Sequence, residues 1–224
     1  MVAVVIQCAA GKRGASLRTM QGIPIRFVAQ PSLGAVDRHA LPAHPDDPSD
    51  RPQATWREMV AAYNADSARS GTNPLELCPA YALYTHPVYR GLEQRFGIDA
   101  LYILSAGWGL LRADYLTPDY DITFSHQADP INIRGRNQLF HDHRHIPEDV
   151  QGPVIFIGGM GYLPQFLRLT ETVRAPRRAF FNSAVQPQAE RCRMIRFETT
   201  RRTNWHYSCA QDLIAGRLDR WLAP

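Results

Sequence analysis

The sequence predicts an α/β fold, a single three-layer domain with a mixed, mostly parallel central sheet flanked by helices. Three short apolar segments, Val2–Ile6, Leu101–Leu104 and Val154–Ile157, each lead into glycine or polar residues. Uninterrupted apolar runs of this length are typical of strands that are buried on both faces of a sheet. Helical patterns alternate with these segments, so we expect parallel strands joined by helices, with residues 1–224 forming one domain.

The first strand is followed by a loop of small residues and two cations, residues 7–14. Such a loop can hold an anion, but it lacks the G-x-x-x-x-G-K-[ST] pattern of phosphate-binding loops, which gives nucleotide hydrolysis little support. Ile23–Phe27 is expected to form a second short strand or an edge hairpin. Residues 30–54 are rich in proline and are expected to form a long irregular insertion.

Helix boundaries are marked by capping residues. Thr55 followed by Glu58 forms a capping box, so a helix is expected from Thr55 to just before Gly71, and a shorter helix is expected to run through Phe96 and stop at Gly97. In the C-terminal part we expect a helix over 163–173, strands over 179–181 and 194–197, and a closing helix capped by Ser208. The inward face of that last helix is expected to carry Leu213, Ile214, Leu218, Trp221 and Leu222.

Composition indicates a cytoplasmic protein. Of the 224 residues, 45% are hydrophobic and 21% charged, and no apolar run approaches the ~20 residues that span a bilayer. The N-terminal segment has no basic region before it, so we interpret it as a strand and not a signal peptide. The four cysteines include no Cys-x-x-Cys pair, which favours free thiols. We expect no membrane partner, no cofactor and no metal.

Nearly all of the positive charge is arginine, because Lys12 is the only lysine in the sequence. Arginine is suited to phosphates and to stacking on bases, although codon usage in a GC-rich genome would produce the same bias. The arginines cluster in the C-terminal part of the chain. This cluster indicates either binding to a polyanion or, equally, a face exposed to solvent. Its members are Arg168, Arg174, Arg177, Arg178, Arg191, Arg193, Arg196, Arg201 and Arg202.

The stretch from Leu101 to Phe124 is the leading candidate for a pocket. A buried strand ends at Ser105, a turn with Gly107 and Gly109 follows, and aromatic and acidic residues come after it. The alternative is a tight connection with a satisfied aspartate. Val154–Ile157 similarly runs into Gly158 and Gly159 before a helix, which is the form of a phosphate site in doubly wound folds.

Three motifs in this order resemble the YaaA-like superfamily: Tyr89-x-Gly-Leu, then Ile-Leu-Ser105-x-x-x-Gly-Leu-Leu, then Pro-x-Tyr-Asp121-x-Thr. That superfamily includes the peroxide-stress protein YaaA and domains associated with deazaguanine transglycosylases and phage defence. The insertion after Pro31, Trp108 in place of a tyrosine or smaller aromatic, and the intervening Asp119 are departures. The resemblance implies a protein directed at DNA, and for some members a glycosylase that removes modified bases.

Glycosylase chemistry needs a carboxylate beside the anomeric carbon, since the sugar becomes cationic as the base leaves. Asp121 is the first choice and Asp119 the second. The extruded base needs stacking and edge-reading groups. The candidates for these are Trp108, Tyr115, Tyr120, Ser105, Asn132 and Asn137. The candidates for binding phosphates, which would make binding steeply salt-dependent, are Lys12, Arg13, Arg134, Arg136, Gly158 and Gly159.

The leading hypothesis is therefore a DNA glycosylase that hydrolyses the N-glycosidic bond of a modified base, such as a hypermodified phage pyrimidine, in DNA repair or phage defence. One alternative is base exchange or modification on a nucleoside or tRNA, and another is a non-catalytic DNA-binding stress protein. A metal-dependent hydrolase using His141, His143 and His145 is a further alternative, although a surface loop is the simpler interpretation of these histidines.

Overall fold

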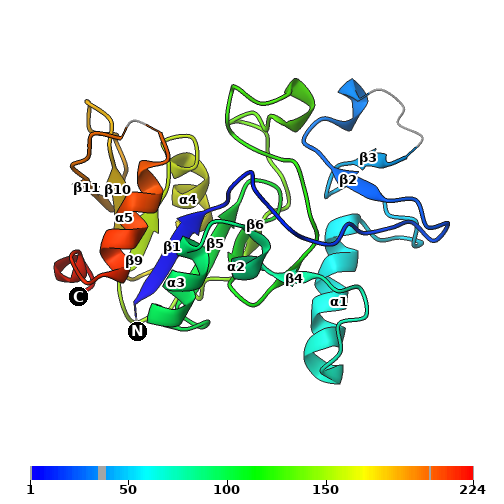
Figure 1. Cartoon of the computed structure of the whole chain (residues 1–224), viewed down its shortest axis with the longest axis horizontal. Coiled ribbons are helices and arrows are strands. Elements are labelled where there is room, and N and C mark those ends of the chain that lie inside the picture. The colour runs from blue at the N-terminus through cyan, green and yellow to red at the C-terminus, as the bar shows by residue number, and fades with distance from the viewer. Residues whose placement is uncertain (1, 35–38, 202, 224) are drawn as a thin grey trace.

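The computed structural model describes residues 2–34, 39–201 and 203–223, and these residues are built around one seven-stranded mixed sheet (Figure 1). The strand order is β11-β10-β9-β1-β5-β6-β8. Neighbours among β11, β10, β9, β1 and β5 pair in parallel, while β6 is antiparallel to β5 and parallel to β8. The predicted α/β class and mixed, mostly parallel sheet are confirmed. The strands are β1 (Ala3–Gln7), β5 (Leu101–Ser105), β6 (Gly109–Arg112), β8 (His143–Arg144), β9 (Val154–Ile157), β10 (Arg177–Phe181) and β11 (Cys192–Arg196).

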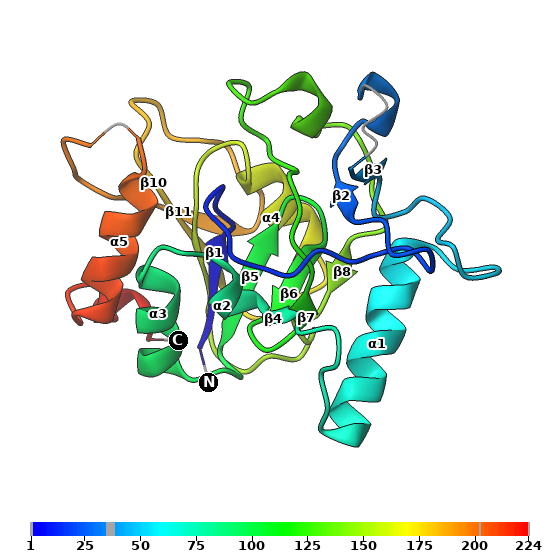
Figure 2. The ribbon, with the colours of Figure 1, turned by 45° about the vertical axis from the view of Figure 1, so that its right-hand side comes forward.

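Helices cover both faces of this sheet. α3 (Val88–Phe96) packs against α5 (Trp205–Ile214) on one face, and α4 (Leu163–Leu169) lies on the other (Figure 2). The short α2 (Ala80–Leu83) precedes α3, and α1 (Trp56–Ser70) extends from the side of the molecule. Burial on both faces explains the uninterrupted apolar sequence of β1, where residues 4–6 are fully buried. None of the helices in the described ranges is long and apolar enough to cross a membrane.

Two small sheets flank the main one. β2 (Ile25–Phe27) pairs in parallel with β3 (Leu41–Ala43), and β4 (Cys78–Pro79) pairs antiparallel with β7 (Leu116–Thr117). The insertion over 30–54 is therefore not wholly irregular as predicted. The short strand predicted over 23–27 is confirmed as β2, and an antiparallel bridge between Arg18 and Pro24 precedes it. The prediction for the insertion failed because β3 contains Pro42 and is too short for an alternating pattern to show. Residues 35–38 of the insertion lie outside the described residues.

Capping residues predicted helix ends well at α1 and α3 and poorly at the C-terminal helix. α1 has the full capping box at Thr55 and ends at Ser70, just before Gly71, and α3 ends at Phe96, just before Gly97, as predicted. α5 instead begins at Trp205 after Asn204, so Ser208 lies inside the helix and not at its cap. Likewise α4 ends at Leu169, earlier than the predicted end at residue 173.

Candidate functional site

The connections of the main sheet diverge at β1. From β1 the chain continues to β5 on one side of it, and later returns to β9, β10 and β11 on the other side. In open α/β sheets a crevice forms at such a switch point, outside the carboxyl ends of the strands. The loops that follow β1 and β9, beginning at Cys8 and Gly158, meet at this edge (Figure 1).

A pocket of about 620 Å³, here called the large pocket, opens at this edge of the sheet. Its walls come from the segments that follow β1, β7, β9 and β10 and from the start of α5. Polar side chains dominate the part of the lining formed by the C-terminal segments. The residues that line it are Gln7, Cys8, Ala9, Ala10, Thr123, Ser125, Gln127, Gly159, Met160, Tyr162, Asn182, Ser183, Thr203, Asn204, Trp205, His206 and Tyr207.

The side chain of Gln7, at the end of β1, contacts both the loop after β9 and the start of α5. Its Oε1 atom accepts a hydrogen bond of 2.5 Å from the backbone N–H of Gly159, and its Nε2 atom lies 3.4 Å from Nε2 of His206. Burial, with a smaller contribution from His86, lowers the pKa of His206 to about 4. The imidazole is therefore neutral at physiological pH, and its Nε2 atom can accept from the Gln7 amide.

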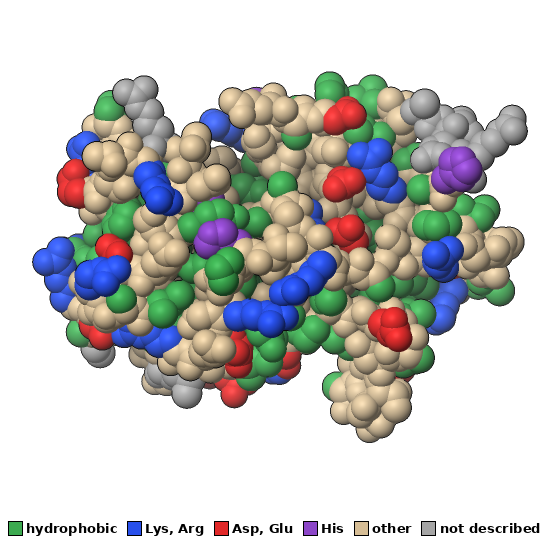
Figure 3. All heavy atoms as spheres, viewed as in Figure 1, with side chains coloured by type: hydrophobic (Ala, Val, Ile, Leu, Met, Phe, Trp, Pro, Cys, Tyr) green, Lys and Arg blue, Asp and Glu red, His purple; other side chains and the backbone are tan. Residues whose placement is uncertain are grey.

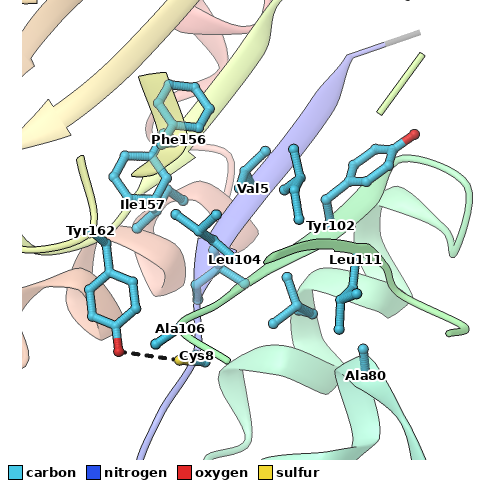
Figure 4. Close-up of a cluster of buried hydrophobic side chains, with 14 of the residues drawn as sticks. Val5, Cys8, Ala80, Tyr102, Leu104, Ala106, Leu111, Phe156, Ile157 and Tyr162 are labelled. Carbon is cyan, nitrogen blue, oxygen red and sulfur yellow. Dashed lines mark hydrogen bonds between the residues drawn. The ribbon is translucent and has the colours of Figure 1, made fainter. Parts of the chain in front are cut away.

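Buried hydroxyl groups lie below the pocket. The Sγ atom of Cys8 lies 3.2 Å from the hydroxyl of Tyr162, as Figure 4 shows. The hydroxyls of Tyr84 and Tyr120 are 2.7 Å apart. Burial raises the pKa of Tyr84, Tyr120 and Tyr162 well above the ordinary value, so these phenols stay neutral. They form a rigid, uncharged floor.

A second, smaller cavity of about 130 Å³, here called the small cavity, adjoins the large pocket. Cys8, Ala9, Ala10, Thr123 and Tyr162 line both. The small cavity alone adds three polar groups to this shared wall, and it has room for one small ring. These groups are the ammonium of Lys12, the carboxylate of Asp121 and the amide of Asn132.

Asp121 faces the small cavity and is ion-paired there. Its Oδ2 atom accepts a 2.9 Å hydrogen bond from Nε of Arg26, and its side chain is 47% exposed. Asp119 lines neither cavity. Its Oδ1 atom accepts from the backbone N–H of Tyr120, and burial raises its pKa while the charge of Lys12 opposes the rise. The structure thus places Asp121 in the site and Asp119 beside it.

Most of the predicted base-binding residues lie elsewhere. Ser105 is buried and accepts from the backbone N–H groups of residues 107 and 108, and Trp108 is buried in the core against Phe27, with ring centroids 5.0 Å apart. Neither can reach a ligand, because neither is exposed to a cavity. Tyr120 lies in the floor, and Tyr115 lies in a separate pocket beside α1. Of this group only Asn132 lines the small cavity, while Asn137 lines a different surface pocket.

The predicted phosphate-binding residues also lie in different parts of the structure. Gly159 and Lys12 line the site, Gly158 is buried beside it, and Arg13 is exposed on the same loop. Arg134, in contrast, is 3% exposed and forms a bidentate pair with Asp142 at 2.9 and 2.7 Å, so it serves the core and is not available to phosphate. Arg136 is exposed in the pocket that holds Asn137.

Some of the arginines that cluster in the C-terminal part of the sequence are held by contacts within the protein. On the face shown in Figure 3, Lys and Arg side chains lie in separate groups. Arg177 is buried and donates to the backbone carbonyls of residues 167 and 190, and Arg178 donates to the carbonyls of residues 221 and 223. Arg202 lies outside the described residues. The arginine-rich segment is thus partly structural.

The three histidines do not come together as a ligand set. His141 has a 90% exposed side chain, while His143 and His145 pack on Tyr115 with their own ring centroids 5.0 Å apart. Burial lowers the pKa of His143 to about 3 and that of His145 to about 4. Over the described ranges, no group of three or more His, Cys, Asp or Glu is placed to hold a metal ion.

Sequence reasoning missed the C-terminal wall of the large pocket. Asn182 and Ser183 directly follow β10, so the carboxyl-end rule that identified Gly159 would have found them too. His206 and Tyr207 carried no such signal. They lie in the first turn of α5, whose N-cap was predicted at Ser208, four residues after the observed N-cap Asn204.

A scan against protein-family models, a search of curated proteins and a search of solved structures each found no match to this chain. The resemblance to the YaaA-like superfamily therefore stays a prediction.

Proposed function

We propose that the protein is a DNA glycosylase, an N-glycosyl hydrolase that removes a modified base from DNA. The observation that carries the proposal is the carboxylate of Asp121 in a small cavity that opens into a large polar pocket. This division fits a nucleotide turned out of the duplex, with its sugar ring in the small cavity and its base in the large pocket.

The chemistry follows from the position of the carboxylate. As the bond from C1′ to the base nitrogen breaks, positive charge grows on the sugar, and Asp121 stabilises it. The base leaves with the electron pair of that bond, a water molecule adds to C1′, and the proton that the water loses passes to the base. Arg26 holds one carboxylate oxygen at 2.9 Å and so fixes the orientation of the group.

Base recognition is assigned to the large pocket. Asn182, Asn204 and Thr123 offer donors and acceptors for the edge of a base, and the ring of Tyr207 offers a stacking surface. Tyr207 is itself held by His86, with stacked ring centroids 3.7 Å apart. The volume of about 620 Å³ leaves room for a base with a bulky substituent, which favours a hypermodified base over an ordinary one.

The test is base release by the wild-type protein and by Asp121→Asn. Duplexes with hydroxymethylated or glucosylated pyrimidines are incubated with each protein, and abasic sites are detected as alkali-labile breaks. Loss of the charge is expected to lower the rate by roughly 10²–10³-fold, the usual effect of removing one transition-state-stabilising group.

Asp66→Asn is the matched control, since the Asp66 side chain is 67% exposed on α1, away from the site. No base release by the wild-type protein from any of these duplexes would contradict the proposal. Equal, measurable rates for wild type and Asp121→Asn would contradict the role proposed for Asp121. DNA binding without base release would support a non-catalytic DNA-binding protein instead. Mass spectrometry of the product separates hydrolysis from base exchange, because exchange leaves C1′ occupied by a new base.

A further inference from the structure

We propose that Lys12 is the nucleophile of an abasic-site lyase, which forms an imine with the sugar aldehyde left after base removal and cleaves the strand. The inference rests on the proposed glycosylase function, because its substrate is the product of that reaction. Its basis is the placement of a primary amine in the same small cavity as Asp121.

The position of the Lys12 side chain is set by its backbone. The N–H of Arg13 donates to the carbonyl of Leu83, and the N–H of Thr85 donates to the carbonyl of Gly11, both at 2.9–3.0 Å. These bonds hold residue 12 in a bridge to Tyr84, and Lys12 lines the small cavity. A half-buried amine at a cavity wall is placed for contact with a sugar, not only with an external phosphate.

The surroundings suit an amine that becomes an imine. Nζ of Lys12 lies 4.3 Å from the centroid of the Tyr120 ring. The face of an aromatic ring stabilises a cation, and it stabilises equally the protonated imine that forms at the same nitrogen. Attack requires the neutral amine. Asp119 lies near enough for the charge of Lys12 to oppose the rise that burial produces in the pKa of Asp119.

The reaction balances without a cofactor. The Lys12 nitrogen adds to C1′ of the open-chain aldehyde, and the carbinolamine loses water to give the protonated imine. The carboxylate of Asp121 takes a proton from C2′, and the electron pair forms a C1′–C2′ double bond. The nitrogen lone pair then re-forms the C1′–N double bond, and the C1′–C2′ electron pair shifts to form a C2′–C3′ double bond. The 3′ phosphate leaves C3′ with the electron pair of the C3′–O bond, which breaks the strand. Water then hydrolyses the imine and frees Lys12.

The test uses DNA with one abasic site made beforehand, so that base removal is not needed. With sodium cyanoborohydride present, hydride reduces the imine and links protein to DNA, and a gel and peptide mass spectrometry locate the link. We expect a covalent complex at Lys12 and, without the reductant, strand cleavage without alkali. Lys12 is the only lysine in the chain, so the α-amino group is the only other primary amine.

Lys12→Arg is the decisive variant, because it keeps the positive charge but cannot form this imine. We expect it to lose both the covalent complex and the cleavage, and to keep affinity for DNA and the thermal unfolding midpoint. Arg69→Gln, a change at a 79% exposed cation on α1 that lines neither cavity, is the control and is expected to keep both. DNA whose abasic aldehyde has been reduced beforehand should give no complex.

The inference is overturned if wild type gives no covalent complex, if the complex persists in Lys12→Arg, or if the complex forms without strand cleavage. Base release without a covalent complex refutes the lyase and leaves the glycosylase proposal standing. A covalent complex with abasic DNA, but no base release from any modified duplex, refutes the glycosylase and keeps the lyase.

Discussion

At the scale of single residues, charge type alone is a poor guide to role, because burial decides what a charge can do. Arg134 and Arg136 are two residues apart and were both expected to bind phosphate. Arg134 is 3% exposed and held by Asp142, whose side chain is fully buried, while Arg136 is exposed. Arg168 also donates to Asp142, so the two guanidinium groups share one buried carboxylate.

Replacing Arg134 by glutamine should destabilise the fold by about 3 kcal/mol, because the buried Asp142 would lose its bidentate partner. The remaining contact from Arg168 is the reason for choosing the lower end of the usual range. Urea unfolding measures the effect. Arg136→Gln is the matched control and should stay within about 0.5 kcal/mol of wild type. Equal stability of the two variants would show that the Arg134 pair is not structural.

At the scale of elements, the first turn of α1 is hydrogen-bonded to the turn that follows β5. Arg57, 4% exposed in its first turn, donates to the carbonyl oxygens of Gly107 and Trp108 at 2.9 and 3.0 Å. The start of α1 thereby holds the turn in place. The chain continues from this turn through β6 and β7 to Asp121. We therefore expect fraying of the first turn of α1 to disturb the site, although no residue of α1 lines either cavity.

Thr55→Ala should destabilise the protein by about 1 kcal/mol, because it removes the side chain that caps the N–H of Glu58 at 3.2 Å. The same change should make backbone amides at the start of α1 exchange faster. Hydrogen exchange and urea unfolding give the two readouts. Arg69→Ala in the last turn, where the side chain is 79% exposed, should change stability by less than about 0.5 kcal/mol. A comparable loss in both variants would argue against the capping box.

At the scale of the whole molecule, buried neutral histidines make stability depend on pH. Burial lowers the pKa to about 4 for His206, about 3 for His143 and about 4 for His145, from an ordinary value of 6.5. Between those values and 6.5 the unfolded chain binds more protons than the folded one. Stability is therefore fully present above pH 6.5 and is lost as the pH falls.

Lowering the pH from 7 to 5 should reduce the free energy of unfolding, by up to ~1.4 kcal/mol per pH unit below 6.5 for each of the three groups. Urea unfolding at pH 7, 6 and 5 checks the slope. His206→Gln should give a shallower slope, because one of the three groups no longer titrates. A slope unchanged by His206→Gln would mean that His206 is protonated in the folded state as readily as in the unfolded one.

Local signals in the sequence were enough to predict the central strands and two helix ends. Apolar runs marked β1, β5 and β9 because strands buried on both faces must be apolar throughout, and Thr55 with Glu58 marked the start of α1 because helix ends need capping groups. β6 was not predicted, since four residues after a turn carry too little pattern.

The residues of the candidate site likewise divide into those that the sequence predicted and those that only the tertiary structure revealed. Four residues predicted from the sequence line the two cavities. Lys12 and Gly159 were predicted because they follow strands that are readable locally, and Asp121 and Asn132 were predicted from the chemistry that the family resemblance implies. Only the tertiary structure placed Trp108 in the core and brought the start of α5 to the crevice beside β1. Those outcomes depend on packing between segments that lie up to 199 residues apart, as for Gln7 and His206, and no local pattern encodes such contacts.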